Sequence, residues 1–221
     1  MKRHDLVILN SIGREYAVDE AVGNHPELSE SFIHQIIAGD RIPGIIKRQE
    51  ESETDQIQIG FSTWHYRPDG GRIRLNSAAL KEQIAALVSP FEVLLMVSDI
   101  EPYVSIRGIA GSCKVEAGLY GSSALQAVTG KKYRNEKSDI DIYLGCPEAG
   151  GGDLINFQKA VSALERDHQI SFDIEVEYRN RYGIKLKELL SAQKTVLAKG
   201  LYDVQLFERQ TVLEELMGRQ I

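Results

Sequence analysis

Hydrophobic and polar residues alternate strictly in two short stretches of the second half of the chain. Between residues 138 and 144, Ile140, Ile142 and Leu144 are separated by polar or aromatic neighbours. Residues 171–178 repeat the pattern, with apolar residues at every second position: Phe172, Ile174, Val176 and Tyr178. Because successive side chains of a strand point to opposite faces of a sheet, both stretches are predicted to be strands with one buried face.

The same alternation gathers carboxylates on the polar faces of these strands. Asp139 and Asp141 share the polar face of the first strand, and Asp173, Glu175 and Glu177 share that of the second. Two carboxylates held side by side repel each other by roughly 1 kcal/mol or more in a partly buried site. Magnesium relieves such repulsion, since it usually takes one or two carboxylates together with substrate phosphates. The pattern therefore predicts a magnesium site, with manganese as a substitute, and the alternative is an acidic strand face exposed to solvent.

A short helix with a glycine-serine start precedes the first acidic strand. Ser122 is predicted to open a helix that runs to Val128, and Gly130 is predicted to end it. A helix N-terminus that follows a glycine offers free backbone N–H groups and the positive end of the helix dipole, so it binds anions. We therefore expect Gly121 and Ser122 to hold phosphate groups. The segment after the helix adds basic candidates for the same phosphates and leads to the serine that begins the strand: Lys131, Lys132, Arg134, Lys137 and Ser138.

The order of these features resembles the polymerase-beta-like nucleotidyltransferase core. In that core Gly-Ser grips a triphosphate, an Asp-x-Asp pair holds the metals, and a third carboxylate comes from a neighbouring strand. The resemblance implies an α+β fold with a mixed sheet and flanking helices. It also implies Asp139, Asp141 and Asp173 as metal ligands, with Glu175 as the second choice for the third carboxylate.

The first 88 residues are predicted to form a small α/β domain, with the nucleotidyltransferase-like domain over residues 89–221. The expected elements of the first domain are a strand at 4–10, a weak helix at 15–22, a helix capped by Ser29 or Ser31, a strand at 43–48, a hairpin of 57–61 with 72–75, and a helix capped by Ser77. In the second domain the remaining expected elements are a strand or helix at 91–97, a strand at 114–119, a loop at 145–152, a helix capped by Asp153, further sheet or covering segments at 184–191 and 195–207, and a helix at 210–217.

Composition and charge narrow the class of protein. The chain has 221 residues, is 43% hydrophobic and 26% charged, and carries a formal net charge of −6. An acidic surface disfavours general binding to nucleic acid. No apolar run approaches the roughly 18 residues of a membrane span, and we expect no signal peptide. Cys113 and Cys146 have neither metal nor redox spacing, so we expect reduced thiols and a cytoplasmic protein.

Several motifs together resemble a narrower family, the phosphoribosyl-dephospho-CoA transferases of malonate decarboxylase. The central motif carries the resemblance: Tyr120-Gly121-Ser122, Gln126-Ala127-Val128-Thr129-Gly130, Tyr133 and Ser138-Asp139-Ile140-Asp141. Weaker matches follow the family's order along the chain: His4-Asp5-Leu6, Ile45-Ile46-Lys47-Arg48, Asp173-x-Glu175 and Val196-Leu197-Ala198-Lys199. Two positions depart from the pattern, because Lys47-Arg48 replaces a usual arginine pair and Ile174 stands where a glycine is expected. The second departure leaves open whether Asp173 or Glu175 faces the metal.

This resemblance implies an unusual nucleotidyl transfer. The donor would be 2′-(5″-triphosphoribosyl)-3′-dephospho-CoA and the acceptor a serine on the apo acyl-carrier subunit of malonate decarboxylase, with pyrophosphate leaving. Asp173 or Glu175 could accept the serine proton. Lys199 is a candidate phosphate contact. Alternatively, it lies at a sheet edge and extends its ammonium group into solvent. Lys47 and Arg48 are candidates for the pyrophosphate of the CoA-like arm or for an acidic carrier protein.

Two other functions fit the same residues. One is a nucleotidyltransferase that uses ATP or another nucleotide on a small molecule or a protein. The other is an inactive member that binds nucleotide or carrier protein as a regulator. The acids at all three expected positions argue against the inactive member, because a site without chemistry has no use for a costly carboxylate cluster.

Overall fold

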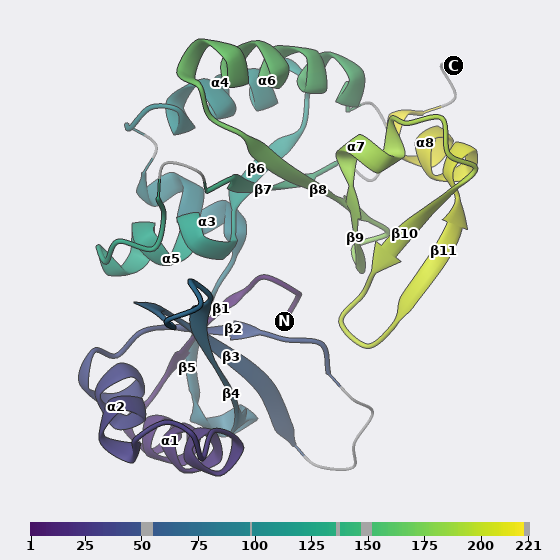
Figure 1. The fold of residues 1–221 in the computed structure, drawn as a ribbon. Helices are drawn as coiled ribbons and strands as arrows, with labels where there is room; N and C mark the ends of the chain where they lie inside the picture. Colours follow the sequence, from purple (N-terminus) through teal and green to yellow (C-terminus); the bar gives the residue numbers. More distant parts are fainter. Residues whose placement is uncertain (50–54, 98, 136–137, 147–151, 219–221) are drawn as a thin grey trace. The chain divides into compact units, whose positions relative to one another are not determined.

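Two separate β-sheets with flanking helices make this an α+β protein (Figure 1). The computed structural model describes residues 1–49, 55–97, 99–135, 138–146 and 152–218. The chain divides into two compact units, Met1–Ser89 with Thr129–Tyr133, and Pro90–Val128 with Arg134–Ile221. A short stretch of the basic segment is thus part of the first unit, although it directly follows the glycine-serine helix in the chain.

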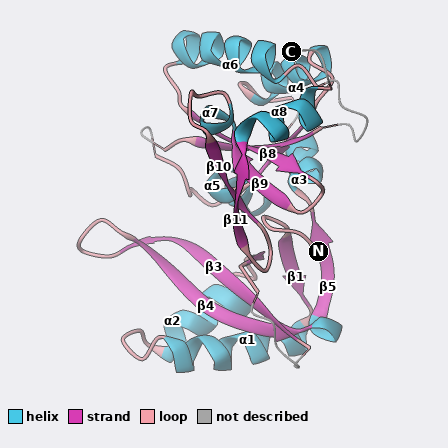
Figure 2. Ribbon diagram, turned by 90° about the vertical axis from the view of Figure 1, so that its right-hand side faces the viewer, coloured by secondary structure: helices cyan, strands magenta, loops and turns pink. Residues whose placement is uncertain are grey.

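The first unit contains a five-stranded sheet in which all neighbours are antiparallel. In spatial order its strands are β4 (Arg72–Leu80), β3 (Gln56–Tyr66), β2 (Gly44–Ile46), β1 (Leu6–Leu9) and β5 (Ile84–Val88). Before β2 the chain forms the helices α1 (Ser11–Asn24) and α2 (Glu30–His34) and the π-helix η1 (Gln35–Gly39). Helix α1 packs on β4 and on α2, and Figure 2 shows these two helices along the β3–β4 ribbon.

Most of the predicted N-terminal elements are confirmed. Ser29 caps α2 by accepting a hydrogen bond from the backbone N–H of Phe32. The predicted hairpin is present and longer than expected, and its turn is closed by the N–H of Arg67, which donates to the carbonyl of Gly71 at 2.7 Å.

The predicted helix after Ser77 is wrong. Ser77 lies inside strand β4, where its buried hydroxyl donates to the carbonyl of Ala17 at 2.7 Å. Beyond β4 the chain forms one 3-10 turn, η2 (Lys81–Gln83), and then strand β5. The helical spacing of apolar residues is outweighed by strand pairing, because β4 pairs along β3 and β5 pairs with β1. The small side chains of Ala78 and Ala79 are buried in this unit, so local helix propensity is overridden.

The second unit contains a six-stranded mixed sheet. Its spatial order is β11 (Val204–Glu208), β10 (Thr195–Lys199), β9 (Tyr182–Lys185), β8 (Phe172–Tyr178), β7 (Ile140–Gly145) and β6 (Glu116–Leu119). Among the described strand pairs of this sheet, β7 and β8 alone are parallel, and helix α6 (Leu154–His168) lies between them in the chain. Parallel neighbours need such a crossover, whereas antiparallel neighbours can be joined by tight turns.

Helices surround this sheet and include the glycine-serine helix. They are α3 (Pro90–Met96), α4 (Tyr103–Ser112), α5 (Gly121–Thr129), α7 (Leu186–Leu189) and α8 (Arg209–Met217). Helices α4 and α6 pack together beside β6 to β8 (Figure 1). Helix α3 settles the 91–97 alternatives in favour of a helix, and Asp153 caps α6 as predicted. Most of the predicted 145–152 loop, residues 147–151, lies outside the described residues, and so does Lys137.

The alternating strands bury the residues that the pattern selected. Ile140, Ile142 and Leu144 are each 0% exposed, and Phe172, Ile174, Val176 and Tyr178 are all buried. Their polar neighbours must therefore share the opposite face of the sheet, which is where the acids lie. Among the described residues, none of the helices is long and apolar enough to cross a membrane.

Candidate functional site

Asp141 and Asp173 are direct neighbours on the two parallel strands. Register places Asp141 of β7 opposite Asp173 of β8, and Tyr143 opposite Glu175 two residues further on. Paired residues of adjacent strands share a face, so the carboxylates of Asp141 and Asp173 stand on the same side of the sheet. Asp139 is exposed and immediately precedes β7.

Strand β9 adds a lysine to this acidic face. Lys185 pairs in register with Glu175, and its Nζ lies 3.3 Å from Oε1 of that carboxylate. The same ammonium is hydrogen bonded to Oδ2 of Asp173 and donates to the hydroxyl of Tyr120 at 3.3 Å. The Glu175 side chain is only 4% exposed, whereas that of Asp173 is 40% exposed. Glu175 is therefore a buried partner of the lysine, and Asp173 is the carboxylate that solvent or a substrate can reach.

The glycine-serine start of α5 lies against Asp141. Tyr120, between β6 and α5, donates its backbone N–H to the carbonyl of Asp141 at 3.1 Å. Gly121 follows with φ +62°, a left-handed conformation that favours glycine. The backbone N–H of Ser122 donates to the Asp141 carboxylate. The helix start that was predicted to hold an anion thus already holds the side chain of the second aspartate of the Asp-x-Asp pair.

The pKa of Asp141 is raised to about 6. Burial is the largest cause, and the charge of Asp173 acts in the same direction, with a smaller contribution from Asp139. Lys185 and the Ser122 N–H oppose the shift, but they do not cancel it. This carboxylate therefore lacks a full counter-charge in the protein itself, which is the electrostatic condition under which a cation binds favourably.

The pKa of Lys185 is raised although burial acts to lower it. The hydrogen bond to Asp173 and the charge of Glu175 outweigh that burial. The lysine is thus held as an ammonium ion, and it neutralises part of the acidic cluster.

The two neighbouring carboxylates are suitable ligands for one magnesium ion, provided that other groups complete its coordination. Oxygen atoms of adjacent carboxylates at Asp141 and Asp173 are the ligands that magnesium accepts when phosphates and water complete its coordination. However, no group of three or more His, Cys, Asp and Glu side chains within the described parts of the chain is placed so that it could hold a metal ion. Metal binding by Asp139, Asp141 and Asp173 therefore stays a prediction.

Lys131 of the basic segment makes structural contacts, and Lys132 is exposed. Lys131 belongs to the first unit, where Nζ lies 3.2 Å from Oδ1 of Asp40 and 4.4 Å from the ring centroid of Trp64. Lys132 belongs to the same unit and is exposed. Their role toward phosphate stays a prediction.

Arg134 and Ser138 stabilise the entry into β7. Arg134 donates from Nη2 to the carbonyl of Ser138 at 2.8 Å, and Ser138 Oγ exchanges hydrogen bonds with Asn135. These contacts fix the backbone directly before Asp139, so both residues can influence the site without contacting a substrate.

The remaining basic candidates lie on other strands. Lys47 and Arg48 follow β2 in the first unit, and Lys47 donates to Oδ1 of Asn76 at 2.9 Å, while Arg48 is exposed. Lys199 ends β10 opposite Gly183, which pairs in turn with Glu177 of β8. Lys199 therefore shares the face of the acidic cluster at the level of Glu177, one pair beyond Lys185.

Sequence reasoning missed Lys185 and Tyr120. The sequence contains enough information to place Lys185. The turn at Arg179 to Arg181 joins two antiparallel strands, and their register can be counted outward from the pair of Tyr178 and Tyr182. That count places Lys185 opposite Glu175. Tyr120 was noted as part of a motif, but nothing in a sequence indicates that its hydroxyl meets a lysine 65 positions away.

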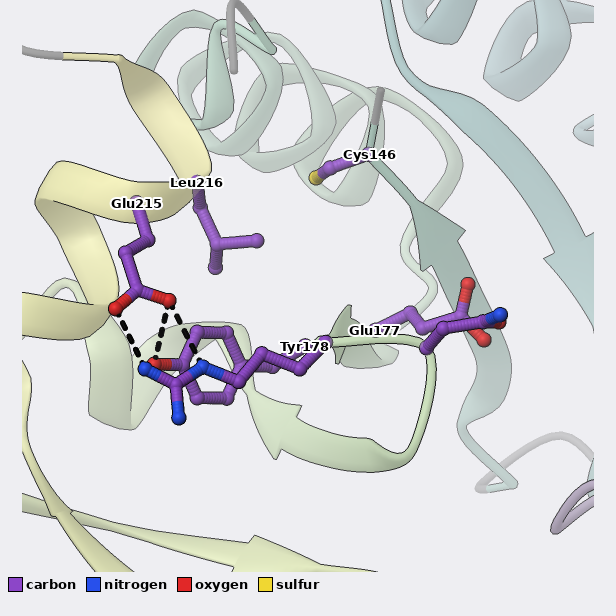
Figure 3. Close-up of a pocket in the computed structure, with 7 residues that line it drawn as sticks. Cys146, Glu177, Tyr178, Glu215 and Leu216 are labelled. Atoms are coloured by element: carbon purple, nitrogen blue, oxygen red, sulfur yellow. Dashed lines mark hydrogen bonds and ion pairs between the residues drawn. The ribbon is translucent and has the colours of Figure 1, made fainter. Parts of the chain in front are cut away.

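A separate cavity lies at the opposite end of β8. It has a volume of about 420 Å³ and is lined by Cys146, Glu177, Tyr178, Arg179, Asn180, Glu215 and Leu216. Figure 3 shows Glu215 of α8 beside Tyr178, with Cys146 directly after the end of β7. The Arg179 guanidinium and the Tyr178 hydroxyl both donate to Glu215, at 2.7 to 2.9 Å. Tyr178 is five residues from Asp173, or roughly 17 Å along a strand, whereas Glu177 of the same lining is only two residues beyond Glu175.

The chain was compared with protein families, with individual proteins and with solved structures. Residues 76–210 match the family described as the phosphoribosyl-dephospho-CoA transferase MdcG C-terminal domain. The chain is also similar to a phosphoribosyl-dephospho-CoA transferase from Bradyrhizobium diazoefficiens, with 22% identity over 98% of this chain and 94% of that protein. No solved structure matches the chain.

Proposed function

Because the chain belongs to the phosphoribosyl-dephospho-CoA transferase family, we propose that it attaches this prosthetic group to a carrier protein. The donor is 2′-(5″-triphosphoribosyl)-3′-dephospho-CoA, and the acceptor is a serine of the apo acyl-carrier subunit of malonate decarboxylase. Transfer proceeds by nucleotidyl chemistry on a polymerase-beta-like core, in the cytoplasm. The order of a glycine-serine helix, an Asp-x-Asp strand and a parallel acidic strand supports this core.

The reaction exchanges a phosphoanhydride bond of the donor for a phosphoester bond to the carrier. The serine hydroxyl oxygen attacks the phosphorus attached to the ribosyl 5″ oxygen, and the bond from that phosphorus to the pyrophosphate oxygen breaks. A phosphodiester to the carrier serine forms, pyrophosphate leaves, and the serine proton passes to a carboxylate. Asp173 is the preferred acceptor of this proton over Glu175, because its side chain is the more exposed of the two.

Residues of the chain itself supply positioning and charge. Gly121 and Ser122 at the start of α5 hold the terminal phosphates, and the Ser122 N–H is shared with the Asp141 carboxylate, to which it donates. Lys185 holds Asp173 and Glu175 in place. A magnesium ion at Asp139 and Asp141, with Asp173 as the third candidate, would offset the negative charge of the triphosphate tail when bound. Manganese would serve in its place.

One observation carries the proposal: Asp141 lies between the start of α5 and Asp173, and it retains excess negative charge. The test is mass spectrometry of the apo carrier after incubation with enzyme, donor and magnesium. We expect one added phosphoribosyl-dephospho-CoA group, and no addition with Asp141→Asn. An unmodified carrier with folded wild-type enzyme would contradict the proposal.

The same assay separates the alternative functions. Replacing the donor with ATP should give no transfer. Transfer from ATP to the carrier or to a small molecule would favour a general nucleotidyltransferase. Binding of the triphosphate donor without any turnover would favour a regulatory protein.

A further inference from the structure

Lys185 contacts two acids of the candidate site with a single ammonium group. Its Nζ lies 3.3 Å from Glu175 Oε1, is hydrogen bonded to Asp173 and donates to Tyr120 Oη at 3.3 Å. Register fixes this arrangement, because Lys185 of β9 stands directly opposite Glu175 of β8. The lysine side chain is 25% exposed, so the ammonium is partly withdrawn from water.

The charges of the cluster leave room for one additional cation. Strand register pairs Asp141 with Asp173 and Glu175 with Lys185, and the single positive charge of Lys185 offsets one of the two negative charges on β8. The Lys185 ammonium is paired with the carboxylates of β8, and Asp141 lies on the neighbouring strand β7. Exposed Asp139 stands two residues before Asp141 and adds to the negative charge on this side of the cluster. The negative charge of β8 is therefore partly offset by the lysine, and the negative charge of Asp139 and Asp141 is left for a cation to offset.

We propose that Lys185 takes the place of a second divalent cation, so that the site binds one metal ion at Asp139 and Asp141. The inference rests on the proposed function, and it deepens the description of the same site. Lys185 is a positioning residue in this scheme, since it holds the β8 carboxylates beside the reacting groups. Tyr120 fixes the lysine through its hydroxyl, and its backbone N–H donates to the carbonyl of Asp141. Tyr120 thus connects Lys185 to Asp141.

The experiment counts manganese ions bound to the intact chain. Purified protein is titrated with Mn²⁺, and the free ion is measured by its electron paramagnetic resonance signal. We expect one Mn²⁺ per wild-type chain. In Lys185→Met the β8 carboxylates lose their ammonium, so the count should rise to two. Lys185→Arg keeps the charge and should stay at one.

A neighbouring lysine provides the matched control. Lys187 lies two residues further along, its side chain is 62% exposed, and its Nζ is 3.8 Å from Glu165. Its Nζ also donates to the backbone carbonyl of Phe172 at 3.4 Å, so Lys187→Met removes the same charge together with a backbone contact beside Asp173, and the count should stay at one. If Lys185→Met does not fold, the double variant Glu175→Gln with Lys185→Met replaces it. That variant removes the buried carboxylate together with its lysine partner but still frees Asp173 for a second ion.

The outcomes distinguish this inference from the proposed function. Two Mn²⁺ ions on a wild-type enzyme that transfers normally would overturn the inference alone. A single ion of unchanged affinity in Lys185→Met would also overturn it. No bound Mn²⁺ on the wild type would overturn the metal site of the proposed function together with the inference.

Discussion

The carboxylate of Asp141 fills the space that a side chain at position 121 would need. A Cβ built on Gly121 would lie 2.9 Å from Cγ and 3.3 Å from Cβ of Asp141, and nearer still to Oδ2. This close approach lets the backbone at the start of α5 reach the aspartate. Glycine is therefore required at position 121 for both conformation and space, and the requirement comes from the site itself.

Gly121→Ala should damage both stability and transfer. The left-handed backbone alone costs an alanine roughly 1–2 kcal/mol, and the clash with Asp141 adds to that cost. Gly130→Ala is the matched control, because Gly130 has φ +69° but no atom within 4 Å of the added Cβ. Urea unfolding should show the larger loss for Gly121→Ala, and transfer should be lost only there. Equal losses in the two variants would contradict the clash.

Asp141→Asn should stabilise the metal-free protein at high pH. The folded pKa of about 6 lies above the ordinary aspartate pKa of 3.8, so the folded state binds more protons between these values. Stability contributed by this group therefore falls as pH rises from about 4 to about 6, and the loss persists above. Two pKa units correspond to roughly 3 kcal/mol, so the variant should gain up to about that much at pH 8.

The control for this prediction is Asp139→Asn, because Asp139 is exposed and acts on Asp141 only as a minor cause of its shift. Urea unfolding at pH 5 and pH 8, with chelator present, measures both variants. The advantage of Asp141→Asn over wild type should shrink at pH 5, and Asp139→Asn should show a much smaller advantage at either pH. An advantage that does not depend on pH would point to packing in place of charge.

The alternating strands were predictable because their information is local. Alternation of apolar and polar residues within 138–144 predicts that Ile140 and Ile142 are buried, as they are. The same alternation is enough to assign Asp141 to the opposite, acidic face. The helix from Gly121 to Thr129 was equally local, since Gly121 and Gly130 mark its two ends.

The failures came from information that is not local. Ser77 lies in a strand because β3 pairs along β4, and the helical spacing of the apolar residues that follow could not reveal that partner. Lys131 follows the glycine-serine helix in sequence but contacts Asp40, 91 residues away. Lys185 joined the site only through the register of β9 on β8. Such pairings depend on how distant segments meet, which periodicity does not encode.

Transfer should depend on the position of an acid along β8 more than on the total negative charge of that strand. Asp173→Asn removes the register partner of Asp141 and should lower the transfer rate by roughly 10²–10⁴-fold. Glu177→Gln removes the same charge from the same face two pairs further on, where Glu177 accepts from the Tyr143 hydroxyl at 3.3 Å. That control should transfer within about threefold of wild type. The measurement is the initial rate of carrier modification, and equal losses would mean that charge alone matters.

Cys146 should react slowly with alkylating reagents in the folded protein. Burial, and secondarily the charge of Glu177, raises the pKa of this thiol to about 12, so little thiolate exists at pH 8. Compared with an ordinary cysteine, the rate of alkylation by iodoacetamide should fall by roughly 10²–10³-fold. A Cys113→Ser background isolates the signal, since Cys113 is the second free cysteine. Glu177→Gln should speed the reaction modestly, because the smaller of the two causes is removed, and urea should restore the ordinary rate. Cys146 reacting in native protein as fast as in urea would show that the thiol is not held at the wall of the cavity in Figure 3.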